Sequence, residues 1–291
     1  MVSRRSVLCA LPAAALAVPM SSCARQVEHA TTSGTDPAST PASAVTTTVP
    51  PSGVPLIYQP GVNAQVRHDV PAVVKTALRR VWSVWAAPIA AAGRPLSSPR
   101  GVQVTATRDQ FTALGGGQAG GVAATTKADG TVILAPDLWT GTTQQGQIVV
   151  MAHEFTHVVL HSQTSASARW LVEGPPEWTA YHDTGLALSV VAPRMAAATR
   201  AGRPATGPPT DAEFTEGPLQ SAYQSAFTWC SFLVQHSTAD VFTGFVIAAT
   251  DRPAAHLAQI FESHYGTAIA SLSSAYQRFQ QTTFGTAPTS A

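Results

Sequence analysis

Two histidines and a glutamate, close together in the sequence, constrain this chain more than any other feature. His153, Glu154 and His157 form the pattern H-E-x-x-H inside the largely apolar stretch 146–160. Such a stretch is typical of a buried helix, on which residues four apart share one face. Two imidazoles on one face can bind Zn²⁺, and the adjacent glutamate can act on a metal-bound water. The pattern therefore predicts a zinc helix; a core helix with two hydrogen-bonded histidines is the competing interpretation.

A catalytic zinc site also needs a third protein ligand and an open position for water. The metzincin spacing H-E-x-x-H-x-x-G-x-x-H is absent, because Leu160 stands at the glycine position and Gln163 at the third histidine. His161 lies one further turn along, where a straight helix cannot bring it to the same metal. We expect His161 to stand at the end of the helix, or to contact a metal ligand rather than the metal itself. The third candidate is the segment 170–181, which reads W-L-V-E-G-P-P-E-W-T-A-Y.

Together with H-E-x-x-H, this segment resembles the gluzincin metallopeptidases, the group that includes thermolysin and the zinc aminopeptidases. In those enzymes a second helix carries a glutamate ligand, often in a W-L-x-E-G-x-A-x-Y-like context. The chain matches that context at Trp170, Leu171, Glu173, Gly174 and Tyr181. The resemblance implies that Glu173 is the third zinc ligand. The motifs that carry this resemblance lie within residues 120–181.

The same resemblance gives Glu177 a supporting role. Glu177 lies one turn after Glu173, an offset at which the family commonly has a carboxylate that hydrogen-bonds a zinc-bound imidazole. Pro175 and Pro176 depart from the family pattern, and two prolines are comfortable only in the first turn of a helix. We therefore expect the second helix to start near Gly174, with Glu173 at its mouth and Glu177 as a rival ligand.

The resemblance implies a zinc-dependent peptidase acting on a peptide or protein substrate, with Glu154 as general base toward a metal-activated water. In this family a Tyr or His of the helical lobe stabilises the oxyanion. We expect Tyr223 in that role, with His182, His256 and His264 as rivals, and a core aromatic is the competing interpretation of Tyr223. The aminopeptidase element G-x-M-E-N is absent from the sequence, which argues against an aminopeptidase.

The alternative function is that of a non-catalytic zinc-containing envelope protein that binds a partner or peptide in its cleft. Glu154 favours the enzyme, because a purely structural zinc site does not need this glutamate. The departure from the family pattern at Pro175 and Pro176 favours the alternative.

The first 23 residues indicate an export signal. Arg4 and Arg5 precede an apolar run from Val7 to Val18, and two serines precede Cys23. The sequence M-S-S-C resembles the lipid-attachment site of bacterial lipoproteins, with ordinary signal cleavage as the alternative. We therefore expect the protein in the bacterial cell envelope, lipid-anchored through Cys23 to the outer face of the cytoplasmic membrane, or secreted.

Three further segments follow from composition. Residues 24–55 are rich in Thr, Ser, Ala and Pro and predict a flexible linker. Residues 56–281 are the expected metallopeptidase-like domain, and residues 282–291 a flexible tail. The net charge of +1, with 11% charged residues, provides no basic surface for nucleic acid. Membrane contact is expected only through Cys23, and Cys230 is expected to be a buried apolar residue.

The hydrophobic pattern predicts an α+β fold, with a small sheet, the zinc helix and a C-terminal helical lobe, and the cleft between them. A first helix is expected at 69–89, capped by Asp69, and a strand at 101–107. A hairpin is expected at 120–136; in gluzincins an edge strand at this place pairs with the peptide substrate. Later helices are expected at 219–236, 240–249, 253–264 and 269–281, with Gly266 as a break.

Overall fold

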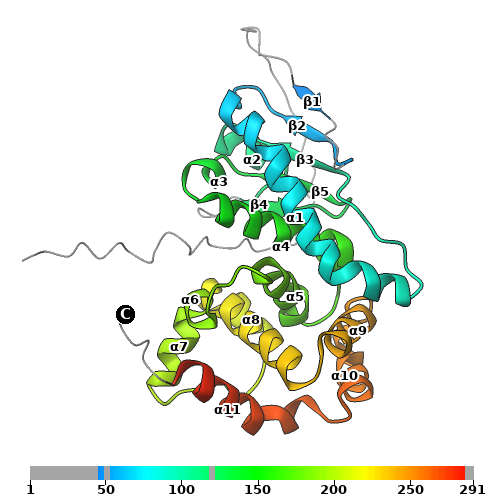
Figure 1. Cartoon of the computed structure of the whole chain (residues 1–291), viewed down its shortest axis with the longest axis vertical. Helices are drawn as coiled ribbons and strands as arrows, with labels where there is room; N and C mark the ends of the chain where they lie inside the picture. Colours follow the sequence, from blue (N-terminus) through cyan, green and yellow to red (C-terminus); the bar gives the residue numbers. More distant parts are fainter. Residues whose placement is uncertain (1–44, 49–52, 118–121, 286–291) are drawn as a thin grey trace, which may run out of the picture.

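The computed structural model of the chain describes residues 45–48, 53–117 and 122–285. The expected export signal, the lipid site at Cys23 and most of the expected linker lie outside these residues. Figure 1 shows a small sheet with helices beside it and, below it, a group of helices formed by the C-terminal half. The fold is α+β and mostly helical, in agreement with the class that the sequence predicted.

The sheet has five strands in the order β1-β2-β3-β5-β4. Their bounds are Thr46–Thr48 (β1), Leu56–Tyr58 (β2), Gly101–Val104 (β3), Ala124–Thr126 (β4) and Thr131–Leu134 (β5). The three inner strands β2, β3 and β5 are parallel, and the edge strands β1 and β4 run antiparallel to their neighbours. All four residues of β5 are buried, as is typical of a strand covered on both faces.

The predicted hairpin is confirmed by the antiparallel pairing of β4 with β5. Lys127 N donates to Thr131 O at 2.8 Å, and Asp129 Oδ1 accepts from Thr131 N at 3.0 Å. Gly130 has φ +82°, a conformation that glycine adopts without strain. This turn leaves β4 at the edge of the sheet, beside helix α4 (Gln144–Leu160), which carries His153 and His157.

The structure extends the folded part beyond both ends of the expected domain. Strand β1 lies inside the expected linker 24–55, where its three residues pair with the edge of β2. Val54 is also buried. At the other end, helix α11 (Ser273–Phe284) continues into the expected tail 282–291, because Phe284 is fully buried in the core. Residues 286–291 lie outside the described part.

The first helix, α1 (Ala64–Ala91), begins five residues before the predicted start at Asp69. Its cap is Asn63, whose side chain accepts from Val66 N at 2.8 Å. Pro71 consequently lies inside the helix and cannot donate to the carbonyl of Arg67. That carbonyl accepts from the hydroxyl of Tyr58 at 3.3 Å instead, so strand β2 compensates for the missing helical hydrogen bond.

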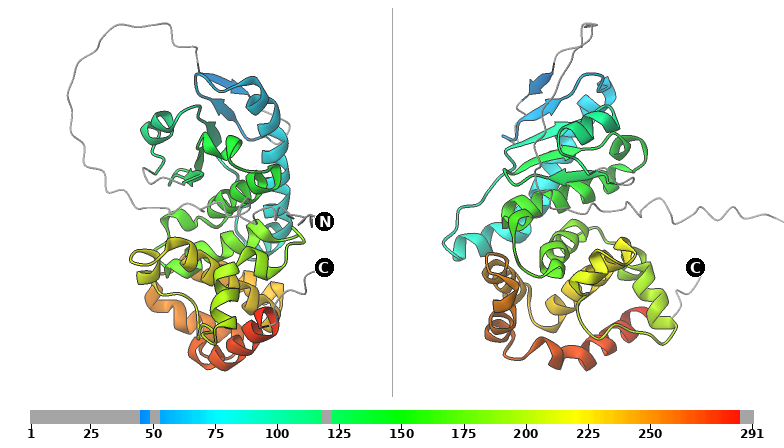
Figure 2. Two further views of the ribbon diagram at one scale, coloured as in Figure 1. Left: turned by 90° about the vertical axis from the view of Figure 1, so that its left-hand side faces the viewer. Right: turned by 180° about the vertical axis from the view of Figure 1, so that it is seen from behind.

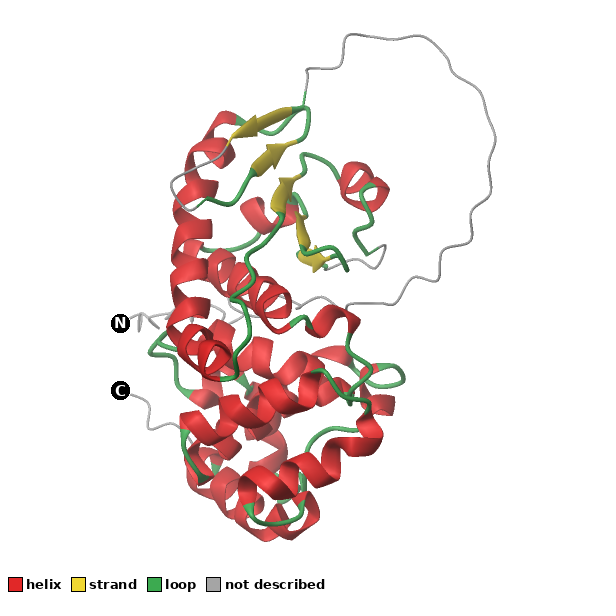
Figure 3. Ribbon diagram, turned by 90° about the vertical axis from the view of Figure 1, so that its right-hand side faces the viewer, coloured by secondary structure: helices red, strands yellow, loops and turns green. Residues whose placement is uncertain are grey.

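Helix α4 lies between the sheet and the lower helices, where it packs against α1, β4 and α5 (Arg169–Tyr181). Two further views show the sheet and α11 at opposite ends of the molecule (Figure 2), and the lower part as almost entirely helical (Figure 3). The other helices are α2 (Arg108–Ala113), α3 (Asp137–Thr140), α6 (Leu188–Val191), α7 (Pro193–Arg200), α8 (Leu219–His236), α9 (Ala239–Thr250) and α10 (Leu257–Tyr265).

Several helix predictions for the C-terminal half are confirmed. Helix α8 has the predicted bounds, and α9 and α10 agree with two more of the predicted helices to within a few residues. Gly266 ends α10 with φ +68°, as the predicted break. Within the described residues, no helix combines the length and the apolar character needed to span a membrane.

Helix α5 begins at Arg169, so the predicted start near Gly174 is wrong. A distant side chain explains the early start: Asp211 Oδ1 accepts from the backbone N of Arg169 at 2.8 Å. Pro175 and Pro176 consequently lie inside the helix, and Glu173 sits in its second turn rather than at its mouth.

Gly174 allows α5 to approach α8 closely. A Cβ at this position would lie 2.6 Å from Sγ of Cys230 and 3.2 Å from the carbonyl oxygen of Ala226. Cys230 itself is a free, fully buried thiol, as predicted, and burial raises its pKa well above the ordinary value. The spacing between α5 and α8 therefore depends on the missing side chain of Gly174.

We predict opposite effects of alanine at two helical glycines. Gly174→Ala should lower the free energy of unfolding by about 1–3 kcal/mol, because the new methyl group overlaps Cys230. Gly244→Ala in α9 is the matched control: its Cβ would meet His264 at an ordinary 3.5 Å, so we expect a gain of about 0.5–1 kcal/mol. Urea unfolding in the presence of a chelator measures both. A Gly174→Ala protein as stable as the wild type would contradict the close packing.

Candidate metal centre

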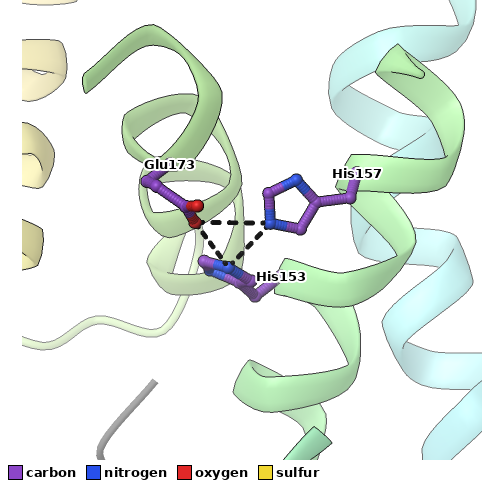
Figure 4. Close-up of side chains that lie close together, drawn as sticks. All are labelled: His153, His157 and Glu173. Carbon is purple, nitrogen blue, oxygen red and sulfur yellow. Dashed lines mark hydrogen bonds and ion pairs between the residues drawn. The ribbon is translucent and has the colours of Figure 1, made fainter. Parts of the chain in front are cut away.

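Three buried side chains from two helices converge on one point (Figure 4). Helix α4 contributes His153 and His157, and α5 contributes Glu173; all three are 0% exposed. The two Nε2 atoms lie 3.1 Å apart. Oε2 of Glu173 lies 3.6 Å from Nε2 of His153 and 3.5 Å from Nε2 of His157. One carboxylate oxygen thus faces two imidazole nitrogens.

The bounds of α4 explain why both histidines face α5. Thr143 caps its start by accepting from Gly146 N at 3.2 Å, and the helix then runs uninterrupted through both histidines. It ends at His161, which adopts φ +55° and lies 2.8 Å from Oγ of Ser97 through its Nε2. The prediction that His161 stands at the helix end is confirmed.

The spacing of the three atoms fits a metal ion. Ligands at 2.0–2.1 Å around a tetrahedral ion are separated by about 3.3 Å from one another. The observed separations of 3.1, 3.5 and 3.6 Å bracket that value. The group formed by His153, His157 and Glu173 can therefore hold a metal ion, with two nitrogens and one oxygen as donors.

The carboxylate of Glu173 has the electrostatic environment of a ligand. Burial raises its pKa, but the adjacent imidazoles of His153 and His157 outweigh burial and hold the pKa well below its ordinary value. Neither of its oxygens makes a hydrogen bond among the described residues. Nη2 of Arg169 lies 3.3 Å from Oε1 and offsets the carboxylate on one side. A bound metal ion would compensate the charge at Oε2, which faces the imidazoles.

The outer nitrogens of the two imidazoles have different surroundings. Nδ1 of His157 lies 2.7 Å from Oγ of Ser162, which can accept its proton and leave Nε2 free for a metal. Nδ1 of His153 lies 4.0 Å from Oε2 of Glu177, which is beyond hydrogen-bond distance, so the expected hydrogen bond between Glu177 and an imidazole is not formed. Burial raises the pKa of Glu177 well above its ordinary value, and the charge of Glu173 adds to this. Glu177 thus lies on the outer side of His153, whereas Glu173 faces both Nε2 atoms.

Glu154 is buried beside the three potential ligands and is held by the edge strand of the sheet. Thr126, the last residue of β4, donates its hydroxyl to Oε2 of Glu154 at 2.5 Å and lies 3.1 Å from the backbone oxygen of the same residue. This contact holds one oxygen of the Glu154 carboxylate against β4.

The sequence reasoning missed Ser162 and Thr126. Ser162 reaches His157 only because the chain reverses at the left-handed residue His161, and spacing along a helix does not reveal such a reversal. Thr126 comes from β4, which is separated from α4 along the chain by strand β5 and the short helix α3. The hairpin prediction placed Thr126 near the motif, but nothing local indicated that its side chain faces Glu154.

Tyr223 of α8 lies beside the cluster. Its ring centroid is 6.1 Å from that of His153 and 5.7 Å from that of Phe214. The three rival histidines have other surroundings in the structure. His182 contacts Trp178 and Asp183 at the end of α5, His264 packs against Phe245, and His256 lies in the turn before α10.

No protein-family model matches the chain, and no curated protein matches its sequence. The function is therefore inferred from the arrangement of the side chains.

We predict different losses of zinc affinity for the two acidic residues of α5. Glu173→Ala removes the carboxylate that, among the described residues, faces both imidazoles, and should largely empty the site. Glu177→Ala removes an outer partner of His153 and should cost about 10–100-fold in affinity. Competition with a chromogenic chelator measures both, and Glu262→Ala on exposed α10 provides a surface control. The reverse order of affinities would make Glu177 the ligand.

Proposed function

We propose that this protein is a zinc-dependent peptidase of the gluzincin type. The observation that carries the proposal is the position of Glu154, a buried carboxylate one residue after a potential metal ligand and held against β4 by Thr126. A structural metal site has no use for such a group. The resemblance of the segments around His153 and Glu173 to the gluzincins supports the same assignment.

The residues of the candidate site would have different roles in peptide hydrolysis. His153, His157 and Glu173 would hold the zinc ion, which when bound lowers the pKa of a water molecule and polarises the scissile carbonyl. Glu154 is the general base: it accepts a proton from the attacking water and later passes it to the leaving amine. Tyr223, beside His153, is our candidate donor to the developing oxyanion.

The edge strand β4 supports a peptide as the substrate. One side of β4 pairs with β5, while the sheet order leaves its other side at the edge. An extended peptide can add to such an edge through backbone hydrogen bonds, regardless of its side chains. Because Thr126 of β4 touches Glu154, a peptide paired along this strand would lie next to the proposed general base.

A non-catalytic zinc protein of the cell envelope is the second candidate. The complete burial of His153, His157 and Glu173 favours it, because structural zinc sites are closed. Glu154 and its contact with Thr126 favour the enzyme, and a single substitution distinguishes the two functions.

Glu154→Gln should abolish peptide hydrolysis and leave zinc content and fold intact. Glutamine is nearly isosteric with glutamate but cannot accept the proton, and loss of a general base typically costs about 10²–10⁴-fold in rate. Digestion of a broad peptide library, followed by mass spectrometry, measures the activity, and metal analysis of the same samples measures zinc. Hydrolysis at the wild-type rate in Glu154→Gln would rule out the mechanism, and no hydrolysis by the wild type would favour the second candidate.

Thr126→Val should lower kcat by about tenfold or more while zinc affinity stays unchanged, because it frees the Glu154 carboxylate to turn. Thr126→Ser retains the hydroxyl and should restore most of the activity. Thr125→Val is the matched control, since Thr125 is the preceding residue of β4 and its side chain points to the opposite face of the strand. Equal losses in Thr126→Val and Thr125→Val would show that Thr126 acts only through the strand.

We further propose that the protein is exported and lipid-anchored at Cys23, on the basis of the charged, apolar and small residues of positions 1–23. Mass spectrometry of the mature protein from its native membrane fraction should identify a modified Cys23 as the first residue. Detection of an uncleaved peptide that spans residues 15–30 would refute lipid attachment.

A further inference from the structure

Arg169, at the start of α5, lies next to the proposed metal ligand Glu173, and sequence reasoning gave it no role. Its Nη2 lies 3.3 Å from Oε1 of Glu173, one helical turn away. The other oxygen, Oε2, is the atom that faces Nε2 of His153 and of His157. The two oxygens of one carboxylate thus face different partners: Oε1 the guanidinium group and Oε2 the metal-binding nitrogens.

We infer that Arg169 is a positioning residue that makes Glu173 a one-oxygen ligand. The inference rests on the metal site of the proposed function, but not on peptidase activity. A carboxylate can bind a metal through one oxygen or through both. With Oε1 drawn to Arg169, only Oε2 is directed at the point between the imidazoles.

Arg169 is itself held in place. Its backbone N donates to Oδ1 of Asp211, and its guanidinium carbon lies 5.9 Å from the centroid of the Phe214 ring. Its side chain is 26% exposed, whereas that of Glu173 is 0% exposed. The guanidinium group thus lies at the boundary between solvent and the buried site, where its charge is hydrated on one side and offsets the carboxylate on the other.

The number of oxygens that Glu173 supplies decides whether water can bind. Two imidazoles and one carboxylate oxygen occupy three of four tetrahedral positions and leave one open, as catalytic zinc sites require. Binding through both oxygens would raise the number of protein donor atoms to four, and the second oxygen would compete with water for the open position. By holding Oε1 away from the ion, Arg169 preserves the open position, and so decides whether the site has the form of a catalytic or a closed centre.

Arg169→Met tests this inference, because methionine keeps much of the apolar stem but cannot hold Oε1. X-ray absorption of the zinc-loaded proteins counts the ligands, and cobalt-substituted proteins give the coordination number independently through their visible bands. In the wild type we expect one Glu173 oxygen at the metal. In Arg169→Met we expect both oxygens, seen as a short metal–carbon distance to the carboxylate carbon and a changed cobalt spectrum.

Arg94→Met is the matched control. Arg94 has a similarly buried side chain, 22% exposed, and pairs with Asp251 at 3.0 Å outside the metal cluster, so its loss should leave both spectra unchanged. Arg169→Lys keeps the positive charge, but the side chain is shorter and lacks the planar guanidinium group. We expect it to show the same change in metal coordination as Arg169→Met. It also provides the test if Arg169→Met does not fold.

Wild-type spectra in both Arg169 variants would overturn the inference. Bidentate coordination in the wild type would also overturn it, and neither result depends on hydrolysis. A wild-type protein that binds zinc through one Glu173 oxygen but hydrolyses no peptide would contradict the proposed function alone.

Discussion

The site depends on the close approach of α5 to α4, which brings one carboxylate oxygen to 3.5 and 3.6 Å from two imidazole nitrogens in a water-excluding interior. Burying the anion of Glu173 there is costly unless cations compensate it. Arg169 lies beside Oε1, and a metal ion would lie at Oε2. The surrounding structure serves this approach: α1 packs against α4, and Gly174 lets α8 press closely on the far side of α5. A bound metal ion would therefore join the two helices as well as provide reactivity.

Local sequence patterns predicted the helices and strands that are indicated by their own residues or by adjacent turn residues. The apolar stretch around His153 gave the zinc-motif helix, the glycine-containing turn before Thr131 gave the hairpin, and the stripe that includes Tyr223 gave α8. The candidate ligands followed from the same logic, because residues four apart on a helix share a face. Glu173 came from the family resemblance, and the structure directs its carboxylate at both Nε2 atoms.

What the sequence could not predict depends on contacts between distant residues. The predicted start of α5 was wrong because it was based on Pro175 and Pro176. The actual start is stabilised by Asp211, which lies far along the chain. In the same way, Thr126 reaches Glu154 from an edge strand, and Arg169 reaches Glu173 only once the helix is known to begin early. Side-chain partners of this kind are set by tertiary packing, which has no periodic signal in the sequence.

The most direct test of the account is the position of the metal itself. A crystal of the zinc-loaded protein, with diffraction recorded on both sides of the zinc absorption edge, should show one anomalous peak between His153, His157 and Glu173. The metal–ligand distances should be about 2.0–2.2 Å. The remaining position should be filled by water within hydrogen-bond reach of Glu154. Zinc bound elsewhere, or at this site without any contact to Glu173, would contradict the account.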